Sequence, residues 1–182
     1  YYNTYHSLSK NPIEGDITNT KKFITHIFGE QTEIGFDYLQ LLYLKPTQIL
    51  PILCLVSKER ATGKSTFLKW LKEIFEYNLT YLTNDSFSSN FNADWASKLL
   101  ICIDEVLFQT EILTERIKYL STTNVNKIEA KGKDRKEIEF FGKFILCSNN
   151  ETSFIKIDAD EIRFWVRKID SYEKEDVHFL SK

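Results

Sequence analysis

The sequence predicts an α/β domain in which helices pack against a mainly parallel sheet. Three short apolar runs have the length of buried strands, and segments with helical spacing of apolar residues lie between them. These runs are ILCLVS (52–57), LLICIDE (99–105) and FILCSNN (144–150). The chain has 182 residues, of which 42% are hydrophobic and 27% charged, and this suits one globular domain with a sizeable core.

The elements are expected in the following order. Helical spacing predicts two short helices within 20–44, which end before Pro46 and Pro51, and later helices at 64–78 and 110–123. Strands are expected at 52–57, 79–83, 99–105, 141–150 and 162–169. Rough alternation within 127–141, around Gly132, predicts a β-hairpin with a basic tip.

Composition limits the possible functions. A formal net charge of −2 gives no overall attraction to nucleic acid, so such binding would need a local basic patch. Cys54, Cys102 and Cys147 each lie in an apolar stretch without zinc-site spacing, and we expect them to be buried core residues. The three histidines are far apart in the sequence, and we assign them no chemistry.

The stretch SKERATGKST (57–66) ends like a phosphate-binding loop, G-x-x-x-x-G-K-[ST], but Lys58 stands where the first glycine is usual. Gly63 permits a close backbone approach, Lys64 would contact the phosphates, and the Ser65 hydroxyl would bind Mg²⁺. An apolar strand before the loop and an amphipathic helix after it support this interpretation. The expected nucleotide-binding residues are Ala61, Thr62, Gly63, Lys64, Ser65 and Thr66.

Polar residues follow two other apolar strands. Asp104 would hold Mg²⁺, and Glu105 would polarise the attacking water; alternatively, both are solvated acids at the end of a strand. Asn149 is the candidate to position the water or the γ-phosphate, whereas Asn150 could equally be a turn residue.

Two basic features complete the set of candidates. Arg163 could reach the γ-phosphate in a neighbouring subunit, or could pair with Asp158, Asp160 or Glu161; Arg167 is the reserve candidate. The predicted hairpin tip carries Lys131 and Lys133, which could bind a phosphate backbone or form an ordinary solvated surface.

Taken in order, these five motifs resemble those of superfamily 3 helicases, and more narrowly the ATPase domain of viral and phage primase–helicase proteins. The resemblance spans roughly residues 35 to 170. It implies an AAA+-like core with a five-stranded parallel sheet between helices, a hairpin insertion, ATP hydrolysis at subunit interfaces of a hexameric ring, and movement on single-stranded DNA.

By this resemblance, each candidate acquires a role. Lys64 and Ser65 match the Walker A lysine and hydroxyl, and Asp104 and Glu105 match the Walker B acids. Asn149 matches the sensor asparagine, and Arg163 matches the arginine finger. Lys131 and Lys133 match the pore-hairpin lysines. The chain departs from the family pattern at Lys58 and Ala61, where glycines are common, and at Ile162, where relatives often carry a second arginine.

The resemblance also sets the expected organisation and partners. We expect a helical lead-in at 1–45 and a P-loop ATPase domain at 46–182, within a longer protein that carries a primase or origin-binding domain before Tyr1. ATP, Mg²⁺, single-stranded DNA and further copies of the chain are the expected ligands and partners. No apolar run could span a bilayer, so we expect no membrane partner and a cytoplasmic location, in the bacterial host if the protein is phage-encoded.

Two alternatives remain open from the sequence. A P-loop kinase or other phosphotransferase would need a mobile arginine-rich lid, for which 127–143 is the comparable segment. A non-catalytic module would bind ATP only to control assembly.

Overall fold

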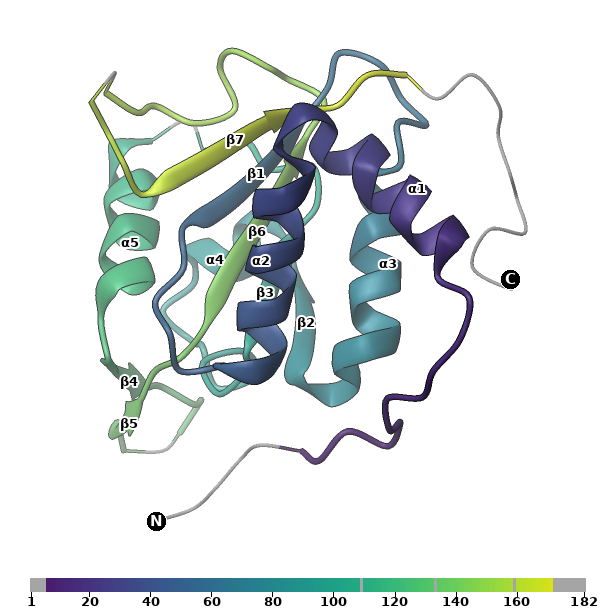
Figure 1. The fold of residues 1–182 in the computed structure, drawn as a ribbon. Coiled ribbons are helices and arrows are strands. Elements are labelled where there is room, and N and C mark those ends of the chain that lie inside the picture. Colours follow the sequence, from purple (N-terminus) through teal and green to yellow (C-terminus); the bar gives the residue numbers. More distant parts are fainter. Residues whose placement is uncertain (1–5, 109, 133, 159, 172–182) are drawn as a thin grey trace.

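The computed structural model describes residues 6–108, 110–132, 134–158 and 160–171. Within these ranges, five parallel strands form the central sheet in the order β2-β3-β6-β1-β7 (Figure 1). The strands are β1 (Ile52–Val56), β2 (Leu79–Leu82), β3 (Leu100–Ile103), β6 (Lys143–Ser148) and β7 (Phe164–Lys168). The predicted five-stranded parallel sheet is therefore confirmed.

Helices cover both faces of this sheet (Figure 1). The longer ones are α1 (Thr18–Phe28), α2 (Thr32–Leu44), α3 (Lys64–Phe75) and α5 (Glu111–Thr122); the short ones are η1 (Gly29–Gln31), η2 (Glu76–Asn78) and α4 (Asn84–Ser88). Helices α1, α2 and α3 pack on one face, whereas α4 and α5 pack on the other. No helix in the described ranges is long and apolar enough to cross a membrane.

Strands β1 and β3 are apolar and buried along their whole length because both faces of the sheet are covered. In β1, Leu53 and Leu55 pack with the α1–α3 layer, and Ile52, Cys54 and Val56 pack with the α4–α5 layer. All three cysteines are buried in the sheet, as expected, and each is a free thiol. Helices α1 and α2 share the core with the strands. The predicted boundary between a helical lead-in (1–45) and an ATPase domain (46–182) stays a prediction.

The predicted hairpin forms a separate antiparallel pair, β4 (Val125–Ile128) and β5 (Lys136–Glu139). The pair begins at Val125 and ends at Glu139, whereas the prediction placed the hairpin within 127–141. The buried side chain of Asn92 ties β4 to the domain: its Nδ2 donates to the Lys127 carbonyl (2.8 Å), and its Oδ1 accepts from the Glu129 N–H (2.8 Å). A backbone hydrogen bond from Asn92 to Glu129 adds a third link (3.2 Å).

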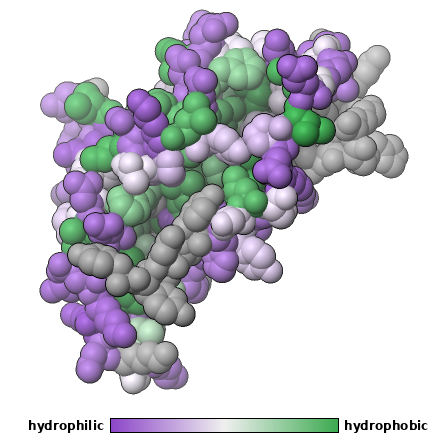
Figure 2. Space-filling model, turned by 60° about the horizontal axis from the view of Figure 1, so that its bottom comes forward, coloured by the Kyte–Doolittle hydropathy of each residue, from purple (hydrophilic) through white to green (hydrophobic). Residues whose placement is uncertain are grey.

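The sequence did not predict helix α4, because it lies in the polar stretch 84–98, which shows no helical spacing of apolar residues. Thr83 caps this helix by accepting a hydrogen bond from the Ser86 N–H (3.1 Å), and Phe87 is its buried anchor. Figure 2 shows the end of the molecule at the bottom of Figure 1, where exposed apolar residues lie among polar ones.

Candidate nucleotide-binding site

The candidate residues gather at one edge of the sheet because its strands are parallel. The segments that follow β1, β3 and β6 all leave the carboxyl edge, where α/β proteins commonly bind ligands. These three strands are neighbours in the sheet. Lys64, Ser65, Asp104, Glu105 and Asn149 come from these segments or from the start of the helix that follows β1.

Lys64 is buried at the first position of α3, with 7% of its surface exposed. Its Nζ donates to the Ser57 hydroxyl and to the Thr62 hydroxyl (3.1 Å). Burial lowers the pKa of the Lys64 ammonium, and nearby Asp104 opposes that change. In the described parts of the chain no carboxylate forms an ion pair with Lys64. Its positive charge is therefore solvated only by neutral hydroxyls, and this favours the binding of an anion.

The loop before Lys64 depends on a left-handed backbone at Gly63, where φ is 93°. An added Cβ there would lie 3.4 Å from side-chain atoms of both Phe23 and Ile27 on α1. The first N–H groups of α3 (at Lys64, Ser65 and Thr66) have no partner within the helix, and together with its dipole they favour a bound anion.

Ser65 and Asp104 meet across two elements. The Ser65 hydroxyl donates to Asp104 Oδ2 (2.8 Å), which joins the start of α3 to the end of β3. Hydroxyl and carboxylate oxygens are the ligand types that Mg²⁺ takes from a protein when phosphates and waters complete its shell. The described residues contain no group of three or more His, Cys, Asp or Glu side chains placed to hold a metal. Ser65 and Asp104 could therefore hold Mg²⁺ only together with phosphates and waters as its other ligands.

Glu105 has an exposed side chain and a left-handed backbone, with φ of 57°. A non-glycine residue rarely adopts this conformation without support from its surroundings. Here Asn84 gives that support: its Nδ2 donates to the Glu105 carbonyl (3.2 Å), and its Oδ1 accepts from the Leu107 N–H (3.3 Å). The Glu105 N–H also donates to Asp104 Oδ1 (3.1 Å).

The two asparagines after β6 differ in their surroundings. Asn150 forms a turn, because its Oδ1 accepts from the N–H groups of Thr152 (3.1 Å) and Ser153 (2.9 Å). The Asn149 side chain is exposed and makes no hydrogen bond to the part of the chain that the structure describes. Asn149 is therefore the one of the two whose amide remains available to a ligand.

Glu151 contacts the start of the loop, where Lys58 stands in place of the usual glycine. The Lys58 N–H donates to Glu151 Oε1 (3.0 Å), and Glu151 Oε2 lies 3.1 Å from Lys168 Nζ. This carboxylate thus ties the start of the loop to the segment after β6 and to β7. No sequence pattern indicates this role, because Glu151 is 93 residues away from Lys58.

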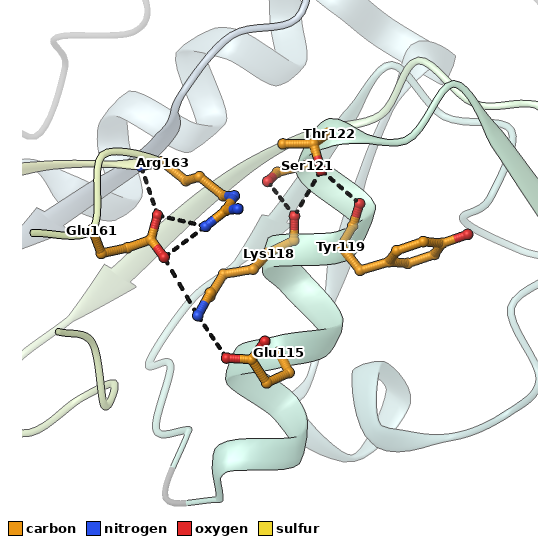
Figure 3. Close-up of polar contacts among 7 residues, drawn as sticks. All are labelled: Glu115, Lys118, Tyr119, Ser121, Thr122, Glu161 and Arg163. Atoms are coloured by element: carbon orange, nitrogen blue, oxygen red, sulfur yellow. Dashed lines mark hydrogen bonds and ion pairs between the residues drawn. The ribbon is translucent and has the colours of Figure 1, made fainter.

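Arg163 lies at the opposite edge of the sheet from the loop. Its carbonyl accepts from the Ile52 N–H at the amino end of β1 (2.8 Å), so the length of β1, roughly 16 Å, separates it from the loop. Figure 3 shows Glu161 between Lys118 of α5 and Arg163. Arg163 Nη1 donates to both Glu161 oxygens (2.8 and 2.7 Å), and Lys118 Nζ lies 3.4 Å from Oε2.

These contacts hold Glu161 ionised. Burial by itself raises the pKa of the Glu161 carboxyl, but hydrogen bonds from Arg163 and Lys118 outweigh it and leave the pKa below its usual value. The predicted alternative, in which Arg163 pairs with a nearby acid, is thus present, although 41% of the Arg163 side chain is exposed. Arg167 instead packs against Gly29 at the end of α1, and its Nε is buried without a partner among the described residues.

The hairpin of β4 and β5 lies at the other end of the molecule from the start of α3 (Figure 1). Lys131 is exposed in the connection between β4 and β5, where Arg135 pairs with Glu129 (2.8 Å). Lys133 lies outside the described residues. The structure therefore does not bring Lys131 or Arg163 to the edge that carries Lys64.

His26 is a further contact that the sequence did not indicate. Its Nε2 lies 2.9 Å from the carbonyl oxygen of Thr62. No motif links these two residues, which are 36 positions apart, and their contact depends on how α1 packs against the loop.

The fold and the clustered residues define a class, an α/β domain with a five-stranded parallel sheet between helices and a candidate phosphate-binding loop at its carboxyl edge. Residues 55–167 match the sequence model of a family described as a family of unknown function (DUF5906). That match covers more than half of the chain, which therefore belongs to this family. No curated protein matches the chain.

Solved structures share the fold. One is the apo structure of the NrS-1 C-terminal region (305–718): its sequence is 20% identical to this chain, the match covers 95% of this chain, and the TM-score is 0.82. Another NrS-1 structure is 22% identical in sequence, its match also covers 95% of this chain, and the TM-score is 0.79. The structure of JCV Helicase with a bound small molecule is 10% identical over 82% of this chain, with a TM-score of 0.50. This chain spans 44% of the length of the chain in each of these three structures.

Proposed function

We propose that this chain is the ATPase domain of a replicative helicase or translocase of the superfamily 3 type, which hydrolyses ATP at subunit interfaces to move on single-stranded DNA. The observation that carries the proposal is the hydrogen bond between Ser65 and Asp104 beside the buried Lys64 ammonium. A hydroxyl, a carboxylate and a lysine at a helix N-terminus are the groups a phosphate–magnesium site requires.

The proposed roles follow from the positions of the residues. Lys64 and the backbone N–H groups of residues 61–66 would bind the phosphates, and Ser65 and Asp104 would hold Mg²⁺, which neutralises charge on the phosphate oxygens when bound. Glu105, exposed and held by Asn84 in a rare backbone conformation, would accept a proton from the attacking water. Asn149 would orient that water or the γ-phosphate.

The arginine finger would act between copies of the chain, as in the hexameric ring implied by the resemblance. Arg163 is too far from the loop of its own chain, and its side chain, 41% exposed, would have to exchange its contact with Glu161 for a phosphate of a neighbouring copy. Arg167 is less suited, because it packs within its own domain. Lys131 and Lys133 on the hairpin would contact the DNA backbone.

The test is ATP hydrolysis measured against protein concentration, with and without single-stranded DNA, with Lys64→Ala as the blank. We expect turnover per chain to rise with concentration and again with DNA. Glu105→Gln should abolish turnover and retain ATP binding, because it removes the proposed base and keeps the shape of the side chain.

Other outcomes would point to other functions. Turnover that depends on neither concentration nor DNA would favour a self-contained phosphotransferase site. ATP binding without turnover in the wild-type chain, under all conditions, would favour a module that only binds nucleotide. Equal turnover in wild type and Lys64→Ala would exclude the proposed site.

A further inference from the structure

The contact between His26 and Thr62 has a defined polarity. A carbonyl oxygen only accepts hydrogen bonds, so the His26 Nε2 atom, 2.9 Å from the Thr62 oxygen, must carry a proton. His26 is half-buried on α1, on the side of the helix that faces the loop between β1 and α3. In Figure 1 the carboxyl-terminal part of α1 lies close to the start of α3.

The same side of α1 also contacts the next residue of the loop. Around Gly63, the nearest atoms to an added Cβ would be those of Ile27 (3.4 Å), Phe23 (3.4 Å) and the His26 ring (3.7 Å). Helix α1 therefore holds the Thr62–Gly63 peptide at two points, by a hydrogen bond at its carbonyl and by packing beside the Gly63 Cα.

Holding this carbonyl also sets the direction of an N–H group. In a trans peptide the C=O and the following N–H point in opposite directions across one plane. Because the Thr62 carbonyl points toward α1, the Gly63 N–H points away from α1. The Thr62 side chain is fixed as well, since its hydroxyl accepts from Lys64 Nζ.

We propose that His26 is a positioning residue of the nucleotide site: by holding the Thr62 carbonyl, it orients the Gly63 N–H to bind a phosphate oxygen. This inference rests on the proposed function, in which the loop binds a nucleoside triphosphate. Helix α1, in the segment expected as a lead-in, thereby becomes part of the site.

The test is the Kd for Mg-ATP, measured by titration calorimetry on the full chain, with thermal unfolding to check that each variant is folded. His26→Phe keeps a ring beside Gly63 but cannot donate a hydrogen bond, and we expect it to weaken binding about tenfold. His26→Gln places an amide N–H near the Nε2 position and should bind within about threefold of wild type. If the phenylalanine ring prevents folding, His26→Leu takes the place of His26→Phe, because leucine also cannot donate a hydrogen bond.

Two controls separate this inference from the proposed function. His6→Leu removes an exposed histidine beside Tyr77 and should leave binding unchanged, whereas Lys64→Ala should abolish it. If Lys64→Ala loses binding while His26→Phe and His26→Leu bind as wild type, the role of His26 is wrong and the proposed function stands. Equal weakening by His26→Phe and His26→Gln would also overturn the role, because packing would then explain the loss. If wild type does not bind ATP, both proposals fail.

Discussion

Lys64 and Lys143 are both buried lysines, but their partners differ. Lys64 contacts side-chain hydroxyls at the carboxyl edge of the sheet, where a ligand can replace them. Lys143, at the amino end of β6, donates to the backbone carbonyls of Pro46 and Phe141 (2.6 Å to the latter) and is only 4% exposed. Lys143 thus joins the segment before β1 to β6 and has a structural role.

Lys143 gives a pH-dependent prediction at the scale of one residue. Burial lowers its pKa from 10.5 to about 8, so between these values the unfolded chain binds more protons than the folded chain. The contribution of Lys143 to the free energy of unfolding should therefore increase as pH rises from about 8 to 10.5, by about 1.4 kcal/mol per pH unit and by about 3 kcal/mol at most.

Urea unfolding of wild type and Lys143→Met across this pH range measures that contribution. The difference in unfolding free energy between wild type and Lys143→Met should rise with pH, because the variant lacks the titrating group. Parallel curves for the two proteins would show that burial does not lower the pKa of Lys143.

At the scale of elements, a few side chains far apart in sequence connect the layers. Glu161 joins α5 to the segment before β7, Asn84 holds the turn after β3, and Asn92 holds the hairpin. In each case a polar side chain satisfies backbone or charged groups that would otherwise lack partners. These links fix the position of segments that contribute little to the apolar core.

Asn92→Ala tests the attachment of the hairpin. The substitution removes hydrogen bonds to the Lys127 carbonyl and the Glu129 N–H, and should lower the free energy of unfolding by about 1–3 kcal/mol. Amide hydrogen exchange in β4 and β5 should also become faster. Asn90→Ala is the matched control, because its exposed side chain makes no hydrogen bond within the described ranges, and it should change stability by less than about 0.5 kcal/mol. Equal effects of both variants would contradict the anchoring role of Asn92.

At the scale of the whole molecule, the candidate groups lie at two opposite edges of the sheet. Lys64, Ser65 and Asp104 are at the carboxyl edge, and Arg163 is at the amino edge. One chain therefore cannot place Arg163 beside its own loop, whereas two adjacent chains could. This separation is the physical reason to expect a composite site between copies.

Mixing two inactive variants tests this arrangement. Lys64→Ala has an intact Arg163 and Arg163→Ala has an intact loop, so a mixed assembly should contain some complete sites and recover part of the ATPase activity. Arg167→Ala is the control, because a residue that acts within its own chain is not complemented in this way. Its mixture with Lys64→Ala should show no more activity than Arg167→Ala alone. Failure of the first mixture, with both variants folded, would argue against Arg163 acting between chains.

Much of the architecture could be predicted from the sequence because it depends on local pattern. The segments ILCLV around Cys54, LICI around Cys102 and FILC around Cys147 are apolar at every position, which is typical of strands buried on both faces, and each lies in a strand of the sheet. The left-handed backbone at Gly63 and the start of α3 at Lys64 also follow from local sequence. Helix α4 was missed because one buried anchor, Phe87, does not make a periodic pattern.

By itself, the sequence determined the fold class, the order of elements and the candidates at the ends of β1, β3 and β6. Only the tertiary structure decided which residues meet: Ser65 with Asp104, His26 with Thr62, Glu151 with Lys58, and Arg163 with Glu161 rather than with the loop. The physical reason is that hydrophobic periodicity encodes which face of an element is buried. Contacts between polar side chains depend instead on the packing of elements that are distant in sequence.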